Sequence, residues 1–190
     1  MLNQWLLDLA QYFAAQDWSI GLHESIYAYA LIETTHVLTL MLFLGMLIVI
    51  DLRMLGLIFR DVSAADLAAR LDKPMIIGFV VMVITGFILY YAIPVRTTQS
   101  IWFRIKVVLL IAAGVNAWLF RKRMQASIHT WARDASPPAH IRRGAIRSLV
   151  FWTGVIFTGR AIAYDWYDCH KPLPEFLQWA AGCIDPSAAE

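Results

Sequence analysis

The chain has 190 residues, of which 59% are hydrophobic and 16% are charged, and its formal net charge is +2. Soluble domains hold about 45–50% apolar and about 25% charged residues, so the composition excludes an ordinary soluble domain and favours a membrane protein. The basic residues lie between the apolar runs and not on an aromatic-studded surface, which argues against a nucleic-acid partner. The length allows one domain, so we expect a single membrane domain over residues 1–190.

The first 52 residues contain no Lys or Arg. Because a secretory signal peptide carries a positive region ahead of its apolar stretch, we expect this segment to belong to the mature protein. Its apolar side chains follow one helical stripe, formed by Trp5, Leu6, Leu9, Tyr12 and Phe13. The stripe predicts a helix that lies at the lipid–water interface on the outer face of the membrane, or that packs over the mouth of a helix bundle.

Four segments are long and apolar enough to cross a bilayer core, which requires roughly 20 helical residues. We expect spanning helices at residues 25–50, 74–93, 101–120 and 148–164, followed by a C-terminal tail at 165–190. Pro74 is expected in the first turn of the second helix, and the Arg121-Lys122-Arg123 run is expected to stop the third. Ser63 is predicted to cap a short cytoplasmic helix at 63–71. The fold class is therefore all-α, an integral membrane four-helix bundle with an N-terminal interfacial helix.

Basic residues gather in the two loops that alternating spans place on one side of the membrane. The loop after the third span carries Arg121, Lys122, Arg123, Arg133, Arg142, Arg143 and Arg147. Because Lys and Arg accumulate on the cytoplasmic side, we expect both termini on the opposite side of a bacterial inner (cytoplasmic) membrane. The only cysteines, Cys169 and Cys183, then lie in an oxidising compartment. A disulfide, two unpaired thiols, or a metal site with Asp168 and His170 are the alternatives there.

Ionisable residues inside a span are costly and usually mark function. Tyr29, Glu33 and His36 form a polar stripe on the first span, because residues at i, i+4 and i+7 share one helical face. Three apolar residues continue this face inward, namely Leu40, Phe43 and Leu47. A face that is polar in its outer half and apolar below suits a cofactor with one polar edge.

Lys106 in the third span and Arg160 in the fourth are expected at the same depth as Glu33 and His36. This set suits haem b, with His36 as the axial ligand of the iron and the two cations near the propionates. Glu33 is also placed to pair with either cation. The alternatives are a His36 that is hydrogen-bonded within the bundle and cations that extend to the outer interface. No other span contains a histidine that could serve as a second axial ligand. We therefore expect an iron without a second axial ligand, an iron ligated by a methionine such as Met82, or a haem shared between subunits.

Two further features of the spans are explained by helix packing rather than by a functional site. Asn116 in the inner half of the third span is expected to form a hydrogen bond between helices. Gly78, Thr85 and Ala92 make a stripe of small residues on the second span, which favours close helix packing.

Three segments carry a resemblance to a known family. They are ETTHVLTLMLFLGMLIVIDLRMLGL at residues 33–57, FRIKVVLLIAAGVNAW at 103–118 and FWTGVIFTGRAIAY at 151–164. Together they resemble an uncharacterised family of small bacterial four-span membrane proteins, known as a domain of unknown function. More distantly, His36 and Lys106 make the chain similar to the membrane haemoprotein type of protoporphyrinogen oxidase and to copper-resistance D-type proteins. Asn116 stands where a second histidine would complete that pattern.

These observations favour a haem-b-binding membrane protein for electron transfer or an oxidoreductase step. Its expected partners are the lipid bilayer, a quinone or redox protein, and further copies of the chain. A small proton- or metal-coupled transporter with Glu33, His36 and Lys106 as a relay is the second hypothesis. The third is a cofactor-free oligomeric membrane scaffold.

Overall fold

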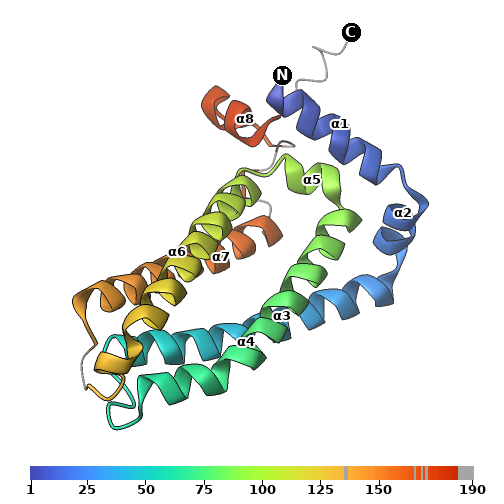
Figure 1. The fold of residues 1–190 in the computed structure, drawn as a ribbon. Coiled ribbons are helices and arrows are strands. Elements are labelled where there is room, and N and C mark those ends of the chain that lie inside the picture. The colour runs from blue at the N-terminus through green and yellow to red at the C-terminus, as the bar shows by residue number, and fades with distance from the viewer. Residues whose placement is uncertain (135–136, 165, 168, 170, 184–190) are drawn as a thin grey trace. The chain divides into compact units, whose positions relative to one another are not determined.

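A computed structural model describes residues 1–134, 137–164, 166–167, 169 and 171–183 (Figure 1). All regular structure in these ranges is helical. The helices are α1 (Leu2–Ala14), α2 (Asp17–Glu24), α3 (Ile26–Met54), α4 (Ala64–Ala92), α5 (Pro94–Thr98), α6 (Ile101–Trp131), α7 (Ala139–Ala163) and α8 (Glu175–Ala181).

Four of these helices, α3, α4, α6 and α7, are long and apolar enough to cross a membrane. Within the single chain most of the apolar surface of each one is exposed, as expected for helices that contact lipid. The prediction of an all-helical protein with four membrane-spanning helices and a short N-terminal helix is therefore confirmed. The short helices α2, α5 and α8 were not predicted, because each covers fewer than three turns and has a mixed sequence.

The second spanning helix begins ten residues earlier than the sequence predicts. The predicted cytoplasmic helix at 63–71 and the predicted span form one continuous helix, α4, with Pro74 inside it. The placement of Pro74 in a first turn was therefore wrong. The Ser63 cap is confirmed, because Ser63 Oγ accepts a hydrogen bond of 3.4 Å from the backbone N–H of Asp66. Ala, Leu and Arg favour helix strongly, so the helical conformation extends through Pro74.

The third and fourth spanning helices are also longer than predicted at their basic ends. Helix α6 continues for about two turns beyond Arg121-Lys122-Arg123, so this run ends the apolar part of the helix but not the helix itself. Helix α7 begins at Ala139, directly after Pro138, whose carbonyl oxygen accepts hydrogen bonds from Ile141 and Arg142. Lys and Arg have high helix propensity, so a helix continues through basic residues that are too polar for the bilayer core. The end of the apolar segment therefore does not coincide with the end of the helix.

The chain forms two compact units. The terminal unit comprises Met1–Thr35, Ile84–Val108 and the described part of Ile156–Glu190, and it contains both chain ends. The central unit comprises His36–Val83 and Leu109–Val155, and it contains the two basic connections.

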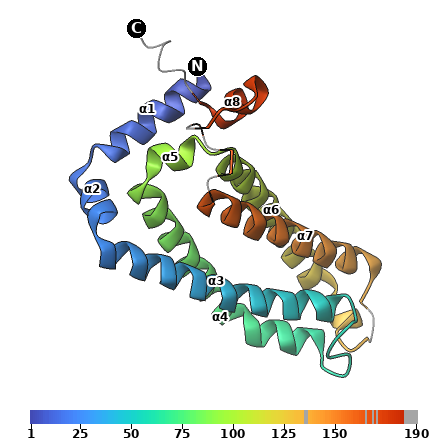
Figure 2. The ribbon, with the colours of Figure 1, turned by 180° about the vertical axis from the view of Figure 1, so that it is seen from behind.

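In the terminal unit, α1 packs against α5, and both views show these helices side by side (Figure 2). Leu7 and Ala10 are buried on α1, whereas Trp5 and Tyr12 are exposed. The helix predicted from the N-terminal stripe is therefore present. Its buried face lies beside the predicted stripe, and the exposed aromatic side chains are free to meet lipid headgroups.

The central unit contains two hydrophobic clusters. The first consists of Phe43, Leu47, Met82, Ala113, Trp152 and Val155, and the second of Met54, Ala64, Trp131, Ile141 and Ala145. In the first cluster the Phe43 and Trp152 rings pack edge to face, with centroids 4.8 Å apart. This contact joins α3 to α7 and places one face of α3 in the core of the unit.

Candidate functional site

His36 lies on the face of α3 that packs into the core of the central unit. Its side chain is half-buried, and the residues one, two and three turns further along this face are Leu40, Phe43 and Leu47. Phe43 is 5% exposed and Leu47 is 8% exposed. The predicted continuation of the histidine face as core packing is therefore confirmed. Leu38, which lies about 200° further around the helix, is exposed, so the opposite side of α3 faces away from this core.

Met82 of α4 lies at a level similar to that of His36. A Cβ atom at Gly78 would lie 3.6 Å from Cβ of Phe43 and 3.9 Å from Cγ2 of Thr39, so α3 and α4 contact each other closely there. At 1.5 Å per residue, Met82 lies about 6 Å along α4 from Gly78, and His36 lies about 4.5 Å along α3 from Thr39 and about 10.5 Å from Phe43. The two helices run in opposite directions from the connection at residues 55–63, so both displacements point the same way (Figure 1).

The Met82 side chain is 6% exposed and belongs to the same hydrophobic cluster as Phe43. Met82 and Gly78 share a face of α4, and His36 and Phe43 share a face of α3, because their spacings are four and seven residues. An imidazole and a thioether thus occupy facing sides of two packed helices. The close approach at Gly78 also agrees with the small-residue packing that the sequence predicts.

Tyr29 and Glu33 belong to the terminal unit. The half-buried Tyr29 side chain interacts electrostatically with Glu33, one turn away, and with Arg96 of α5. Glu33 itself is exposed. Within the described residues no ion pair joins Glu33 to Lys106 or Arg160. The structure therefore brings Tyr29 and Glu33 together with Arg96, a cation of the short helix α5.

Lys106 and Arg160 are also in the terminal unit, on α6 and α7. A Cβ atom at Gly159 would lie 3.5 Å from Nζ of Lys106, so the half-buried ammonium group contacts α7 next to Arg160. Arg160 is exposed, and its guanidinium donates a hydrogen bond of 2.7 Å to the Tyr164 hydroxyl and lies 4.8 Å from the centre of that ring. Arg160 thus points toward the C-terminal end of α7.

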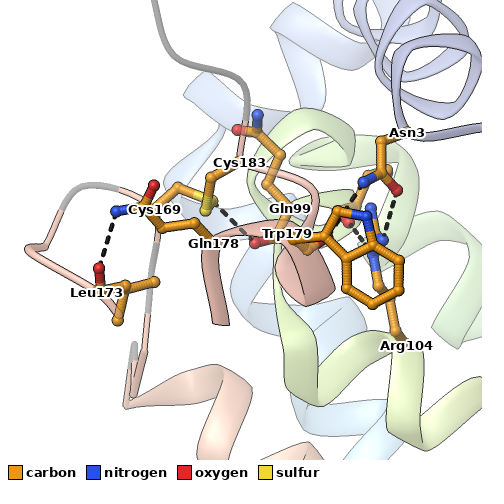
Figure 3. Close-up of a disulfide and its surroundings, with 9 residues drawn as sticks. Asn3, Gln99, Arg104, Cys169, Leu173, Gln178, Trp179 and Cys183 are labelled. Atoms are coloured by element: carbon orange, nitrogen blue, oxygen red, sulfur yellow. Dashed lines mark hydrogen bonds between the residues drawn. A yellow bond between two sulfur atoms is a disulfide. The ribbon is translucent and has the colours of Figure 1, made fainter. Parts of the chain in front are cut away.

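Cys169 and Cys183 form a disulfide in the terminal unit, with their Cα atoms 5.4 Å apart (Figure 3). Of the three alternatives left open by the sequence, the structure therefore has the disulfide, and the two sulfurs are not available as metal ligands. Asp168 and His170 lie outside the described residues. Cys169 Sγ is 3.3 Å from the carbonyl oxygen of Gln99. Because a disulfide sulfur carries no proton, this is a sulfur–oxygen contact and not a hydrogen bond.

Asn116 of α6 is buried and donates a hydrogen bond of 3.1 Å from Nδ2 to the carbonyl oxygen of Gly144 in α7. The predicted hydrogen bond between helices is therefore confirmed. Among the described residues, no group of three or more His, Cys, Asp or Glu side chains is placed to hold a metal ion.

Comparison with known proteins gives one match. The sequence profile of a family of unknown function, DUF6644, matches residues 19–165. The match runs from α2 through all four spanning helices and leaves out α1, Cys169, Cys183 and α8. No curated protein and no solved structure matches the chain. Because the profile covers well over half of the 190 residues, the chain belongs to this family of unknown function.

Proposed function

We propose that this chain is a haem-b-binding protein of the bacterial inner membrane that serves electron transfer or an oxidoreductase step. In this proposal the His36 imidazole is an axial ligand of the iron. The observation that carries it is the burial of Phe43 and Leu47 on the same face of α3, which directs His36 toward the core and away from lipid. An imidazole held on the core side of an apolar span is seldom there for packing alone.

The donor set around His36 suits a haem. Histidine and methionine together ligate iron in cytochromes, and bundle proteins build cofactor sites from side chains on facing helices. Met82 supplies the thioether on the facing helix, and Phe43, Phe79 and Trp152 supply an aromatic environment. When bound, the haem supplies one-electron redox chemistry at a potential that its axial ligands tune.

The polar residues of the predicted site complete the proposal. Lys106 and Arg160 are the proposed partners of the propionates, and Tyr29 and Glu33 form the polar edge. The half-buried position of the Lys106 ammonium group beside Gly159 supports a role within the bundle for this cation. The distant similarity to the membrane haemoprotein protoporphyrinogen oxidase, through His36 and Lys106, points the same way. A quinone or a redox protein is the proposed electron partner, and a homo-oligomer is the proposed assembly.

The proposed orientation places both chain ends outside the cytoplasm. The central unit carries Arg121, Lys122, Arg123 and the other basic residues of the second connection, which favours the cytoplasmic side for that connection. The disulfide between Cys169 and Cys183 supports an oxidising compartment for the tail. Four crossings then return both chain ends to the outer side of the inner membrane.

An absorption spectrum of the full chain, purified after expression with a haem precursor supplied, tests this proposal. We expect a Soret band in the wild-type protein that is lost in His36→Ala and retained in His23→Ala. His23 is a fair control because it is an exposed histidine of α2. A Soret band of full intensity in His36→Ala, in a protein with unchanged helical content, would exclude His36 as the ligand.

A small proton- or metal-coupled transporter is the second candidate. The electrostatic interaction of Tyr29 with Glu33 favours it, because a carboxylate beside a phenol is able to relay protons. Proton-dependent flux into liposomes that Glu33→Gln abolishes and His23→Ala does not would support the transporter. Colourless and inactive liposomes would leave the cofactor-free scaffold as the better description.

A further inference from the structure

A cavity of about 430 Å³ in the central unit is lined only by basic side chains. These side chains are Arg123 of α6 and His140, Arg143 and Arg147 of α7. All four residues are exposed, so the cavity opens to the surroundings. It is distinct from the proposed haem site, because no residue of that site lines it.

Close packing of α6 on α7 brings the four basic residues together. A Cβ atom at Gly144 would lie 2.7 Å from Cδ2 of Phe120, so the ring occupies the space that only a glycine leaves open. The hydrogen bond from Asn116 to the Gly144 carbonyl fixes the same contact one turn away. Arg123 follows Phe120 by one turn, and Arg143 and Arg147 flank Gly144. The cavity is therefore a consequence of a buried helix contact and not of loop conformation.

Basic residues outnumber carboxylates around the cavity, although Arg121, which does not line it, forms an ion pair of 2.8 Å with Asp72 of α4. Residues 121–147 contain seven Lys or Arg and a single acidic residue, Asp134. In the part of the chain that the structure describes, none of the four lining residues forms an ion pair with Asp or Glu. His140, Arg143 and Arg147 share one face of α7 at positions i, i+3 and i+7. Three arginine guanidinium groups line this opening, and their positive charges attract an anion.

The geometry points to a phosphate group as the ligand. Arginine presents a planar fork of N–H donors that matches phosphate oxygens, and three arginines line the cavity. His140 lies in the first turn of α7, where the positive end of the helix dipole also favours an anion. We propose that this cavity binds a phosphate group, carried either by the headgroup of an anionic phospholipid or by a soluble phosphate compound. Basic cavities at the ends of spanning helices bind phospholipid headgroups in this way.

Binding measurements on the delipidated full chain in detergent test this proposal. Isothermal titration is carried out with phosphatidylglycerol in mixed micelles, with phosphatidylcholine as the zwitterionic comparison, and with inorganic phosphate. The lining variant is Arg143→Gln/Arg147→Gln. The matched control is Arg133→Gln/Arg142→Gln, which removes the same charge from exposed residues of the same connection that do not line the cavity. We expect the lining variant to bind phosphatidylglycerol or phosphate about tenfold more weakly or worse, and the control to change by less than about twofold.

The probes separate the two sources of the phosphate group. Binding of phosphatidylglycerol that equimolar inorganic phosphate does not displace supports a lipid headgroup. Binding of inorganic phosphate alone that is lost in the lining variant supports a soluble ligand. An equal loss in both double variants, or no binding of either probe by the wild-type protein, would overturn the proposal. If the double variant does not fold, Arg123→Gln and His140→Gln singly give the same comparison against Arg142→Gln.

Discussion

Nη1 of Arg104 in α6 donates a hydrogen bond of 2.8 Å to Oδ1 of Asn3 in α1, across 101 residues of sequence (Figure 3). Asn3 donates a further hydrogen bond of 3.1 Å to the carbonyl oxygen of Trp179 in α8, and Nε of Arg104 donates one of 3.3 Å to Thr98 in α5. Arg104 thus ties α1, α5 and, through Asn3, α8 to a spanning helix.

The C-terminal end of α8 depends on Gly182. This residue has a positive φ of 76°, and an added Cβ would overlap the Arg104 guanidinium. We therefore expect Gly182→Ala to destabilise the docked tail by about 1 kcal/mol or more. Limited proteolysis of the tail measures this effect, with Gly21→Ala as the control because a Cβ there meets open space. Equal proteolysis of the two variants would contradict the contact between Gly182 and Arg104.

The disulfide between Cys169 and Cys183 is expected to form in the cell. A bridge that closes a loop of this length stabilises the folded state by about 3 kcal/mol. The tail of Cys169→Ser/Cys183→Ser should therefore unfold at a lower temperature than the tail of the wild-type protein. Alkylation of thiols in intact membranes, followed by mass spectrometry, should find both cysteines protected until a reductant is added. Full labelling without reductant would contradict both the bridge and an outer location of the tail.

Arg53 is fully buried in the central unit and joins two segments of chain. Its Nε donates a hydrogen bond of 2.9 Å to the Val62 carbonyl, and its Nη2 one of 3.2 Å to the Asp134 carbonyl. Lysine has a single ammonium group and no fork, so Arg53→Lys should lower the free energy of unfolding by about 2 kcal/mol. Arg70→Lys, at an exposed position, is the matched control. Equal melting temperatures of the two variants in detergent would show that the hydrogen bonds of Arg53 contribute little.

Met82 should affect the spectrum of the bound haem without unfolding the protein. Met82→Leu conserves volume, so it should cost less than about 1.5 kcal/mol, yet it removes the thioether. We expect a shifted Soret band and a lower reduction potential in Met82→Leu. Met75→Leu is the control, because Met75 packs against the same hydrophobic cluster. Identical spectra and potentials for both variants would exclude Met82 as a ligand.

The sequence predicted those features that depend on composition and local spacing. Long apolar runs located all four spans, and the seven-residue spacing from His36 to Phe43 located the buried face of α3. Helix ends were predicted less well, because α6 continues to Trp131 and α4 begins at Ala64 on helix-favouring residues outside the apolar runs. The contacts of Arg53 and Arg104 could not be predicted, since they join segments far apart in the sequence. The cavity around Arg143 depends on Phe120 meeting Gly144, which no local pattern reveals.

The haem content of the purified chain tests the central claim most directly. Full-length protein, expressed with a haem precursor and extracted in mild detergent, is converted to its pyridine haemochrome and compared with the protein concentration. The proposal predicts about one haem b for each chain, and a reduced spectrum that dithionite produces and air reverses. A well-folded protein that contains no haem under these conditions would contradict it.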